Sequence, residues 1–264
     1  MALAPAQRVE RFSESVIREM TRLALKYGAI NLAQGMPDDD PPEPMLEAAE
    51  RALQSGHNQY SITWGVPSLR QAVADRYAAR LGRPIDPDAE VTTGASEGVI
   101  CALMGLVDPG DEVILFEPFY ENYLPGTYMT GAEPVFVRLE SPGFEIRADA
   151  LRAAITPRTR AIVLNNPNNP TGRVFSRSEL EHVAAVCREN DLVLIVDEIY
   201  EFITYGHEHI SAAGLPGMYE RTVTVSGISK TYSATGWRIG HVLAPPALTG
   251  AVRKIHDFTT ACAP

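Results

Sequence analysis

Lysine is scarce in this chain, and one lysine stands in surroundings suited to covalent chemistry. The lysines are Lys26, Lys230 and Lys254. Lys230 lies in the segment VSGISKTYSATG, residues 225–236, whose small side chains let the backbone approach a ligand closely. A lysine amine forms an imine with an aldehyde when its surroundings lower its pKa. Lys26 and Lys254 fall in helical patterns and are expected to be solvated, so Lys230 is the candidate nucleophile.

A carboxylate ends the most apolar of the expected strands. The run LVLIV, residues 192–196, leads directly into Asp197. Ligands bind outside the carboxyl ends of strands in open α/β sheets, and an unpaired buried charge is costly. Asp197 is therefore expected either to pair with a protonated ring nitrogen of a ligand or to cap the following helix. Tyr200, three residues later, is expected to reach a neighbouring ring oxygen.

Two further turns follow expected strands. In VLNNPNNPTG, residues 163–172, Asn169 offers a donor and an acceptor, which suits a phenolic oxygen and a carboxylate together. In VTTGASEGVI, residues 91–100, Gly94, Ala95 and Ser96 precede a helix. Free N–H groups and the helix dipole make a phosphate cradle at such a terminus. Ordinary turn chemistry would account for either segment taken alone.

These motifs are expected to lie on an α/β fold with a mainly parallel sheet between helices, because β-branched apolar runs alternate with helical patterns. Helices are predicted at residues 13–27, 45–55, 68–81, 96–107, 178–190 and 247–260. Strands are predicted at residues 91–92, 113–116, 134–137, 161–164, 192–196, 222–225 and 239–243.

Composition excludes several other classes of protein. The net charge of −10 repels phosphate backbones and argues against nucleic-acid binding. No apolar run approaches the length of a membrane span. Three scattered cysteines predict reduced thiols in a cytoplasmic protein. No metal site is predicted, since His207-Glu208-His209 is interpreted as an exposed loop.

The four motifs occur in the order and spacing of the fold-type I pyridoxal-phosphate enzymes. From about residue 30 to its end, the chain resembles the class I/II aminotransferases of the aspartate aminotransferase superfamily. NQYSITWGVPSLRQAVA, PNNPTG, DEIY and SKTYSATGWRIG are motifs of that family. The segment GHEHISAAGLPGMYERTVTV is most similar to the kynurenine/glutamine/methionine aminotransferase branch. The resemblance implies pyridoxal 5'-phosphate as the cofactor and the large domain of fold type I as the architecture.

The resemblance also implies roles for the residues around the cofactor ring. Lys230 would form the imine with the cofactor and shuttle the proton. Asp197 would pair with the pyridine nitrogen. Tyr200 and Asn169 would contact the ring hydroxyl oxygen, and Tyr120 would stack on the ring.

The remaining implied contacts concern the phosphate and the substrate. Arg238 would clamp the phosphate above the loop formed by Gly94, Ala95 and Ser96. Tyr60 would reach the phosphate of a partner subunit, which implies a homodimer. On the substrate side, the resemblance implies Gly35, Asn169 and Tyr123.

The chain departs from the family pattern at two places. Many members have a phosphate-binding serine three residues before the lysine, where this chain has Gly227, so Ser226 or Ser229 is expected to substitute. Family members continue beyond the position of Pro264 with the arginine that grips the substrate carboxylate. We therefore expect residues 1–45 to belong to an incomplete small domain, and residues 46–264 to form a large cofactor-binding domain truncated at its C-terminal end.

The implied activity is transfer of an amino group from an L-amino acid to a 2-oxo acid. The alternatives are a pyridoxal-phosphate lyase of the cysteine-conjugate β-lyase type, which uses the same residues, and an inactive aminotransferase-like fragment.

Overall fold

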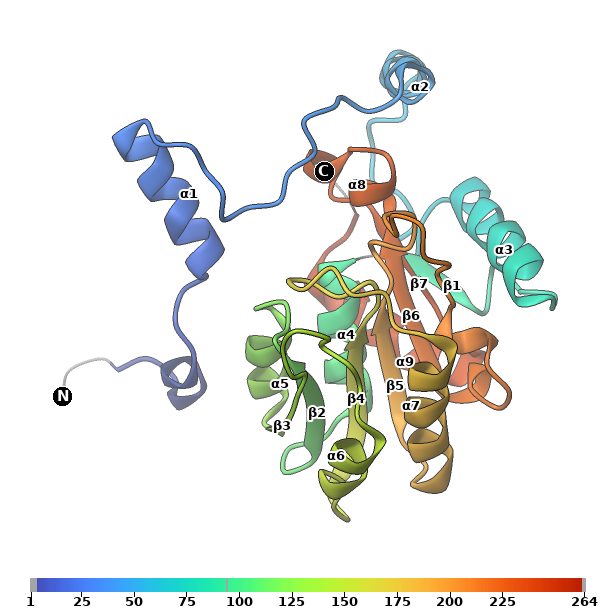
Figure 1. The fold of residues 1–264 in the computed structure, drawn as a ribbon. Coiled ribbons are helices and arrows are strands. Elements are labelled where there is room, and N and C mark those ends of the chain that lie inside the picture. The colour runs from blue at the N-terminus through green and yellow to red at the C-terminus, as the bar shows by residue number, and fades with distance from the viewer. Residues whose placement is uncertain (1–3, 94, 263–264) are drawn as a thin grey trace.

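A seven-stranded sheet forms the centre of the protein in the computed structural model, which describes residues 4–93 and 95–262 (Figure 1). The strands are β1 (Val91–Thr93), β2 (Glu112–Glu117), β3 (Glu133–Arg138), β4 (Thr159–Asn165), β5 (Val193–Asp197), β6 (Thr222–Gly227) and β7 (Gly240–Leu243). Their order across the sheet is β1-β7-β6-β5-β4-β2-β3. The pairs from β3 to β6 are parallel, and β7 is antiparallel to both β6 and β1. The prediction of a mainly parallel sheet is confirmed.

Helices precede and follow these strands, and the predicted ones begin and end within about three residues of their expected positions. The helices are α1 (Val16–Tyr27), α2 (Glu43–Gln54), α3 (Pro67–Leu81), α4 (Ser96–Leu106), α5 (Tyr123–Thr130), α6 (Ala148–Ala153), α7 (Arg177–Glu189), α8 (Ile228–Thr231) and α9 (Pro246–Thr259). The sequence did not predict α5, α6 or α8. Each of them is short, and α5 contains Pro125 and Gly126, which are poor helix formers.

Both faces of the sheet are covered, which explains why its strands read as continuous apolar runs. In β5, Leu194 and Val196 belong to the core cluster that packs against α6 and α7. Val193 and Ile195 belong to the cluster on the opposite face, together with residues of α4, α5 and α9. Burying each such side chain stabilises the fold by about 1.5–3 kcal/mol. Packing of these side chains on the two faces therefore fixes the orientation of β5 in the sheet, and this orientation fixes the position of Asp197 at the end of the strand.

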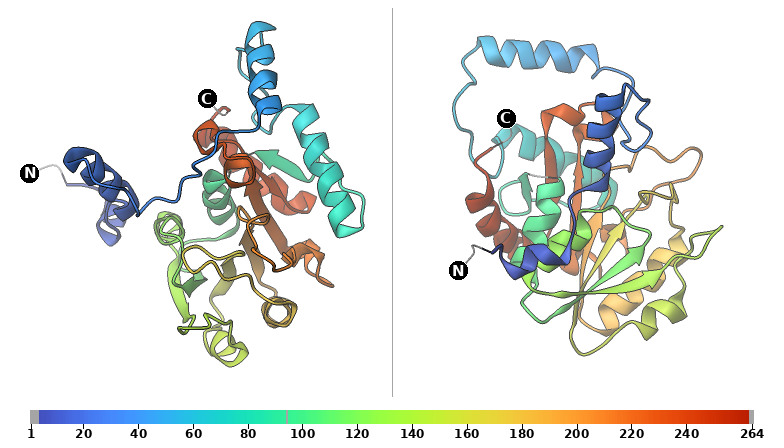
Figure 2. Two further views of the ribbon diagram at one scale, coloured as in Figure 1. Left: turned by 45° about the horizontal axis from the view of Figure 1, so that its top comes forward. Right: turned by 90° about the vertical axis from the view of Figure 1, so that its left-hand side faces the viewer.

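The N-terminal segment stands apart from this body. Figures 1 and 2 show α1 and α2 projecting away from the sheet and its covering helices. No described residue before Gly65 is buried. Helix α1 nevertheless has ordered ends, since the Ser15 hydroxyl accepts a hydrogen bond from the Arg18 amide and Gly28 closes the helix at φ 62°. Among the described residues, no helix combines the length and the apolar character that a membrane span requires.

One edge of the sheet gathers the chemical motifs. Strands β2, β4, β5 and β6 are parallel, so their carboxyl ends lie at the same edge, and Asp197 pairs in register with Asn165 and Val225. Strand β1 runs in the same direction as β6, because both are antiparallel to β7. Strand β7 begins at this edge, where Gly240 lies opposite Gly227. This edge therefore brings together the segments that follow β1, β2, β4, β5 and β6 and the segment that precedes β7.

Candidate active site

A cavity of about 500 Å³ lies at this edge of the sheet. Its volume falls in the range typical of sites for cofactors and small ligands. Ten of the twelve predicted site residues line it: Gly35, Ala95, Ser96, Tyr120, Tyr123, Asn169, Asp197, Tyr200, Lys230 and Arg238. Tyr60 does not line the cavity, and its side chain is 85% exposed. The prediction for Gly94 lies outside the described residues.

Asp197 is a buried carboxylate whose partners in the described part of the chain are neutral. The Tyr123 hydroxyl donates to its Oδ2 at 2.7 Å, and the Ile199 amide donates to its Oδ1 at 3.1 Å. Burial raises the pKa of Asp197, while these two hydrogen bonds lower it. The helix-cap alternative is wrong, because residues 199–202 form turns and no helix of the described chain begins at Asp197; the Ile199 contact belongs to this turn and satisfies only one carboxylate oxygen. A protonated ring nitrogen in the cavity would supply the positive partner that this carboxylate lacks.

The Lys230 amine faces the same cavity from α8. Its Nζ donates to the Gly35 carbonyl oxygen at 2.8 Å and lies 5.9 Å from the centre of the Tyr200 ring. Burial lowers the pKa of Lys230, and the nearby Arg238 guanidinium lowers it further. Both effects favour the neutral amine, which is the nucleophilic form. Gly35 comes from the N-terminal segment, so that segment completes the wall around the amine.

Tyr200 and Asn169 meet beside Asp197. The Asn169 Nδ2 donates to the Tyr200 hydroxyl oxygen at 3.3 Å, and the Asn169 amide donates to Asn165 Oδ1 at 2.6 Å. Burial, and then the Asp197 charge, raise the pKa of Tyr200 to about 12. The phenol therefore remains protonated near neutral pH and presents a hydrogen-bond donor. Asn169 and Tyr200 come from different loops. Asn169 is held by its backbone hydrogen bond to Asn165, and it holds Tyr200 through its side chain.

Aromatic side chains form another wall of the cavity. The rings of Tyr120 and Tyr123 pack edge to face, with centroids 5.6 Å apart. Tyr123 is buried on α5, and its hydroxyl is engaged by Asp197, so it supports the carboxylate as well as lining the cavity. Tyr120 is only partly buried; burial raises the pKa of its phenol, and hydrogen bonding with the Ser96 side chain lowers it. Its ring is the aromatic surface available for stacking.

The opposite end of the cavity suits an anion. Ala95 and Ser96 lie at the N-terminus of α4, where free N–H groups and the helix dipole favour negative charge. Arg238 lines the cavity, and its Nη1 donates to the Thr235 carbonyl oxygen at 2.9 Å. Ser229 also lines the cavity. Ser226 is fully buried and donates to Glu201 Oε1 at 2.7 Å, so Ser229 is the better candidate to replace the missing serine.

Close packing of neighbouring backbone segments explains why residues 227 and 240 are glycines. A Cβ on Gly240 would lie 2.4 Å from the Ala95 Cβ, and a Cβ on Gly227 would lie 2.8 Å from the Ile239 carbonyl oxygen. Neither position has room for a side chain without movement of the backbone. A serine at position 227 would therefore meet the backbone at the start of β7 in this protein.

The chain matches the family model described as aminotransferase class I and II over residues 27–264. It belongs to that family. The probable N-succinyldiaminopimelate aminotransferase of Mycobacterium tuberculosis is 45% identical over 256 residues, which cover 95% of this chain and 64% of that protein. Human kynurenine–oxoglutarate transaminase 1 is 42% identical over 268 residues, which cover 96% of this chain and 64% of that protein. The chain thus spans 64% of the length of these two curated relatives.

Solved structures of aminotransferases share the fold. The N-succinyldiaminopimelate aminotransferase from Mycobacterium tuberculosis superimposes with a TM-score of 0.93 at 42% identity, covering 98% of this chain and 68% of that one. The aspartate aminotransferase from Thermus thermophilus with maleate gives a TM-score of 0.93 at 34% identity, and the match covers 99% of this chain and 70% of that one. The predicted architecture of fold type I is confirmed.

Pyridoxal phosphate is the cofactor of this aminotransferase family, and the cavity fits it. Among the described residues, the donors to the buried Asp197 carboxylate are neutral, which matches a protonated ring nitrogen. Lys230 supplies an amine for an aldehyde. The helix terminus at Ser96, with Arg238, matches a phosphate. These groups lie around one cavity of suitable volume.

Sequence reasoning missed several residues of the aminotransferase cavity. Ile17 and Arg18 reach it from α1, and Gln34 and Met36 flank Gly35 in the N-terminal segment. No local motif marks these four residues, because their place depends on how the N-terminal segment passes over the sheet edge. Gln34 and Met36 adjoin the predicted Gly35 in the segment QGMPD, residues 34–38, which was the signal available for these two, and Ile17 and Arg18 had none.

The interpretation of His207-Glu208-His209 as a purely exposed loop was wrong for His209. That ring is half-buried, bonds Arg80, and contacts the Asn166 carbonyl oxygen at 3.0 Å. Burial lowers the pKa of His209 to about 4, and Arg80 contributes in the same direction. The histidine thus packs behind the Asn166 turn as a neutral group.

Gly227→Ser should lower the free energy of unfolding by about 1–3 kcal/mol, because the new side chain meets the backbone of β7. Urea unfolding measures the change. Gly250→Ser is the matched control, since among the described residues no atom beyond its chain neighbours and the backbone of its own helix lies within 4 Å of a Cβ there, and it should change stability by no more than about 0.5 kcal/mol. Equal stabilities for the two variants would refute the steric explanation.

Proposed function

We propose that the protein is a pyridoxal-phosphate-dependent aminotransferase that moves an amino group from an L-amino acid to a 2-oxo acid. The observation that carries this proposal is that the Lys230 amine and the Asp197 carboxylate face one cavity. The relatives support the same reaction class, since those reported above are named as aminotransferases or transaminases.

The bound cofactor supplies an electron-withdrawing ring that stabilises negative charge at the substrate Cα. Asp197 holds a proton on the ring nitrogen, because its carboxylate favours the charged form of its partner. Tyr200 and Asn169 hold the ring oxygen. Lys230 would hold the cofactor through Nζ until the substrate amine displaces it, and the freed Nζ would then carry the proton to and from the substrate Cα.

The residues around the start of α4 would hold the phosphate of the cofactor and so anchor its ring. Arg238 provides charge-assisted hydrogen bonds, and the amide groups at the start of α4 add neutral donors. Ser229 takes the place of the serine absent at position 227. Tyr120 would stack on the ring and exclude water from one of its faces. Together these contacts hold the reacting carbon near Lys230, and orientation of this kind contributes strongly to rate.

Lys230→Ala should lower the rate of amino transfer by about 10²–10⁴-fold, because the proton carrier is lost. The measurement uses the cofactor, a panel of L-amino acids and 2-oxo acids, and detection of both products. Lys254→Ala is the control, since that side chain is exposed on α9. It should retain the parental rate.

Borohydride reduction followed by peptide mapping identifies the lysine that binds the cofactor. The label should appear on Lys230. A label on Lys26 or Lys254 would rule out the assignment. Release of pyruvate and ammonia without a 2-oxo acid would contradict transfer and indicate the lyase reaction.

The functional unit in this proposal is a homodimer with the active sites at its interface. Tyr60 lies outside the cavity of its own chain and is highly exposed, as a residue that reaches a partner would be. Large apolar side chains on the projecting N-terminal segment are also exposed, among them Leu25, Ile30, Leu32 and Leu53. A second copy of the chain would bury such surface.

Residues 1–45 belong to the small domain in this proposal, and residues 46–264 belong to the large domain. The location is cytoplasmic. Two cysteines support a reducing compartment, because Cys101 and Cys187 are buried free thiols. Burial raises the pKa of Cys187 to about 12.

Tyr60→Phe should weaken cofactor binding by about tenfold, because a phosphate contact from the partner subunit is lost. A spectrophotometric titration measures the dissociation constant, and light scattering should give the mass of a dimer. Tyr27→Phe, at another exposed tyrosine, is the control and should bind like the parent. A monomer with parental affinity in both variants would contradict the dimer proposal.

A further inference from the structure

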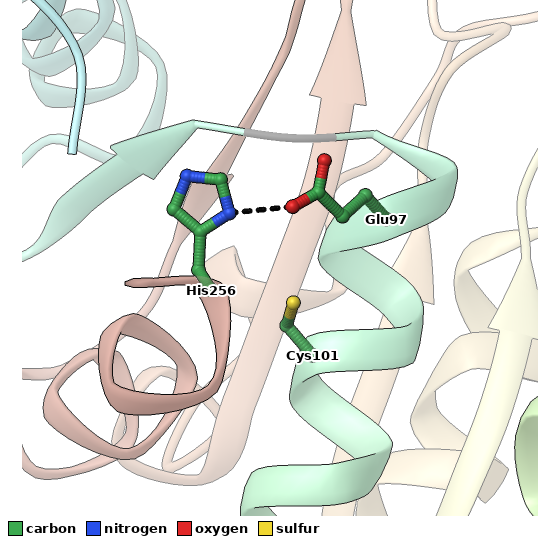
Figure 3. A group of neighbouring side chains, drawn as sticks. All are labelled: Glu97, Cys101 and His256. Atoms are coloured by element: carbon green, nitrogen blue, oxygen red, sulfur yellow. Dashed lines mark hydrogen bonds and ion pairs between the residues drawn. The ribbon is translucent and has the colours of Figure 1, made fainter. Parts of the chain in front are cut away.

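Behind the phosphate end of the cavity, a buried histidine bridges two segments that are far apart in the sequence. His256 lies on α9 and faces Glu97 and Cys101 on α4 (Figure 3). Its Nδ1 is 2.7 Å from Glu97 Oε1, and its Nε2 is 2.8 Å from the Thr63 carbonyl oxygen. The His256 residue is 2% exposed, and its two polar contacts are partly buried.

The two contacts define the charge of this histidine. A carboxylate and a carbonyl oxygen are both acceptors, so the ring must donate from both nitrogens, which only the imidazolium does. Hydrogen bonds with Cys101 and Glu97 raise the pKa of His256 to about 10, against the effect of burial. The bridge is therefore a charged one near neutral pH, with stronger hydrogen bonds than a neutral ring would make.

The first acceptor belongs to the phosphate cradle. Glu97 follows Ser96 directly and is the second residue of α4, whose N-terminus lines the cavity. A displacement of the Glu97 side chain would therefore shift the turn that carries the Ala95 and Ser96 amide groups.

The second acceptor belongs to the segment that carries Tyr60. Thr63 lies three residues after that tyrosine, and its Oγ1 also donates to Asp257 Oδ1 at 2.5 Å. The next residue, Trp64, packs under the Arg253 guanidinium, whose carbon lies 4.2 Å from the ring centre. Helix α9 thus holds this segment at three places, with His256 in the middle.

The Glu97–Cys101–His256 group also has the donor types of a zinc site, with ligand atoms within 4.8 Å of one another. The 2.7 Å separation between His256 Nδ1 and Glu97 Oε1 decides against that interpretation. Two ligands of a tetrahedral zinc ion stand about 3.3 Å apart, given bonds of about 2.0 Å. The geometry is that of a shared proton.

Resting on the proposed function, we propose that His256 is a positioning residue that ties the phosphate cradle at the start of α4 to the segment carrying Tyr60. This charged bridge holds the start of α4, which lines the chain's own cavity, at a fixed distance from the Tyr60 segment, which would reach the partner subunit. Neither Glu97 nor His256 lines the cavity, so both act through their neighbours.

The test compares the cofactor affinities of Glu97→Gln, His256→Gln and the double variant. Each single variant should raise the dissociation constant of pyridoxal phosphate by about tenfold or more, since a charge-assisted buried contact is lost. The double variant should be within about twofold of the worse single variant, because the two side chains form one interaction. His182→Gln, at an exposed histidine on α7, is the control and should bind like the parent.

A second measurement, amide hydrogen exchange, tests the His256 bridge in the absence of the cofactor. In cofactor-free protein, Glu97→Gln should speed amide hydrogen exchange at residues 61–65, although these lie on the far side of His256 from the substitution. His256→Gln should speed exchange there and at residues 95–99. The Glu97 side chain is 31% exposed, so Glu97→Gln decides the matter even if the histidine variants fail to fold.

Lower melting temperatures with unchanged affinity and unchanged exchange at 61–65 would overturn the proposal, since they indicate packing alone. Independent, multiplying effects of the two substitutions would overturn it as well. If the parent does not bind pyridoxal phosphate, the proposed function fails, and the exchange measurement still reports on the bridge.

Discussion

The buried carboxylate of Asp197 is the constraint on which the rest of the site depends. It sits at the end of β5 with 8% of its surface exposed, and its partners are a phenol and a backbone amide. Two neutral donors compensate only part of the cost of removing a negative charge from water. A positive group bound in the cavity would supply the remaining stabilisation, and this is why Asp197 marks this edge of the sheet as the candidate binding site.

The sheet brings the other groups to Asp197 through strand direction. Parallel neighbours place their carboxyl ends at one edge, and the antiparallel β7 returns the chain to that edge at Gly240. Close approach of the backbones then selects residue type, because neither Gly227 nor Gly240 has room for a Cβ. The same packing leaves no room for a serine side chain at position 227, which favours Ser229, a residue of the cavity lining, as the candidate phosphate contact.

The sequence predicted the parts of this arrangement that depend on local pattern. Apolar runs located β5, and the small residues around Lys230 indicated the loop where the amine lies. Helix α5 was missed because Pro125 and Gly126 interrupt its pattern, and its stability comes from packing on α4 and β3. Contacts between distant segments had no sequence signal, and neither the reach of Arg18 into the cavity nor the His256 bridge was foreseen.

The charge of the cofactor ring nitrogen tests the central role of Asp197 most directly. The ¹⁵N chemical shift of a ring-labelled cofactor, bound to the parent and to Asp197→Asn, reports whether that nitrogen carries a proton. The control is Asp191→Asn, at a side chain that is 91% exposed. The account predicts a protonated nitrogen in the parent and the control, and a neutral one in Asp197→Asn. The same shift in all three proteins would contradict it.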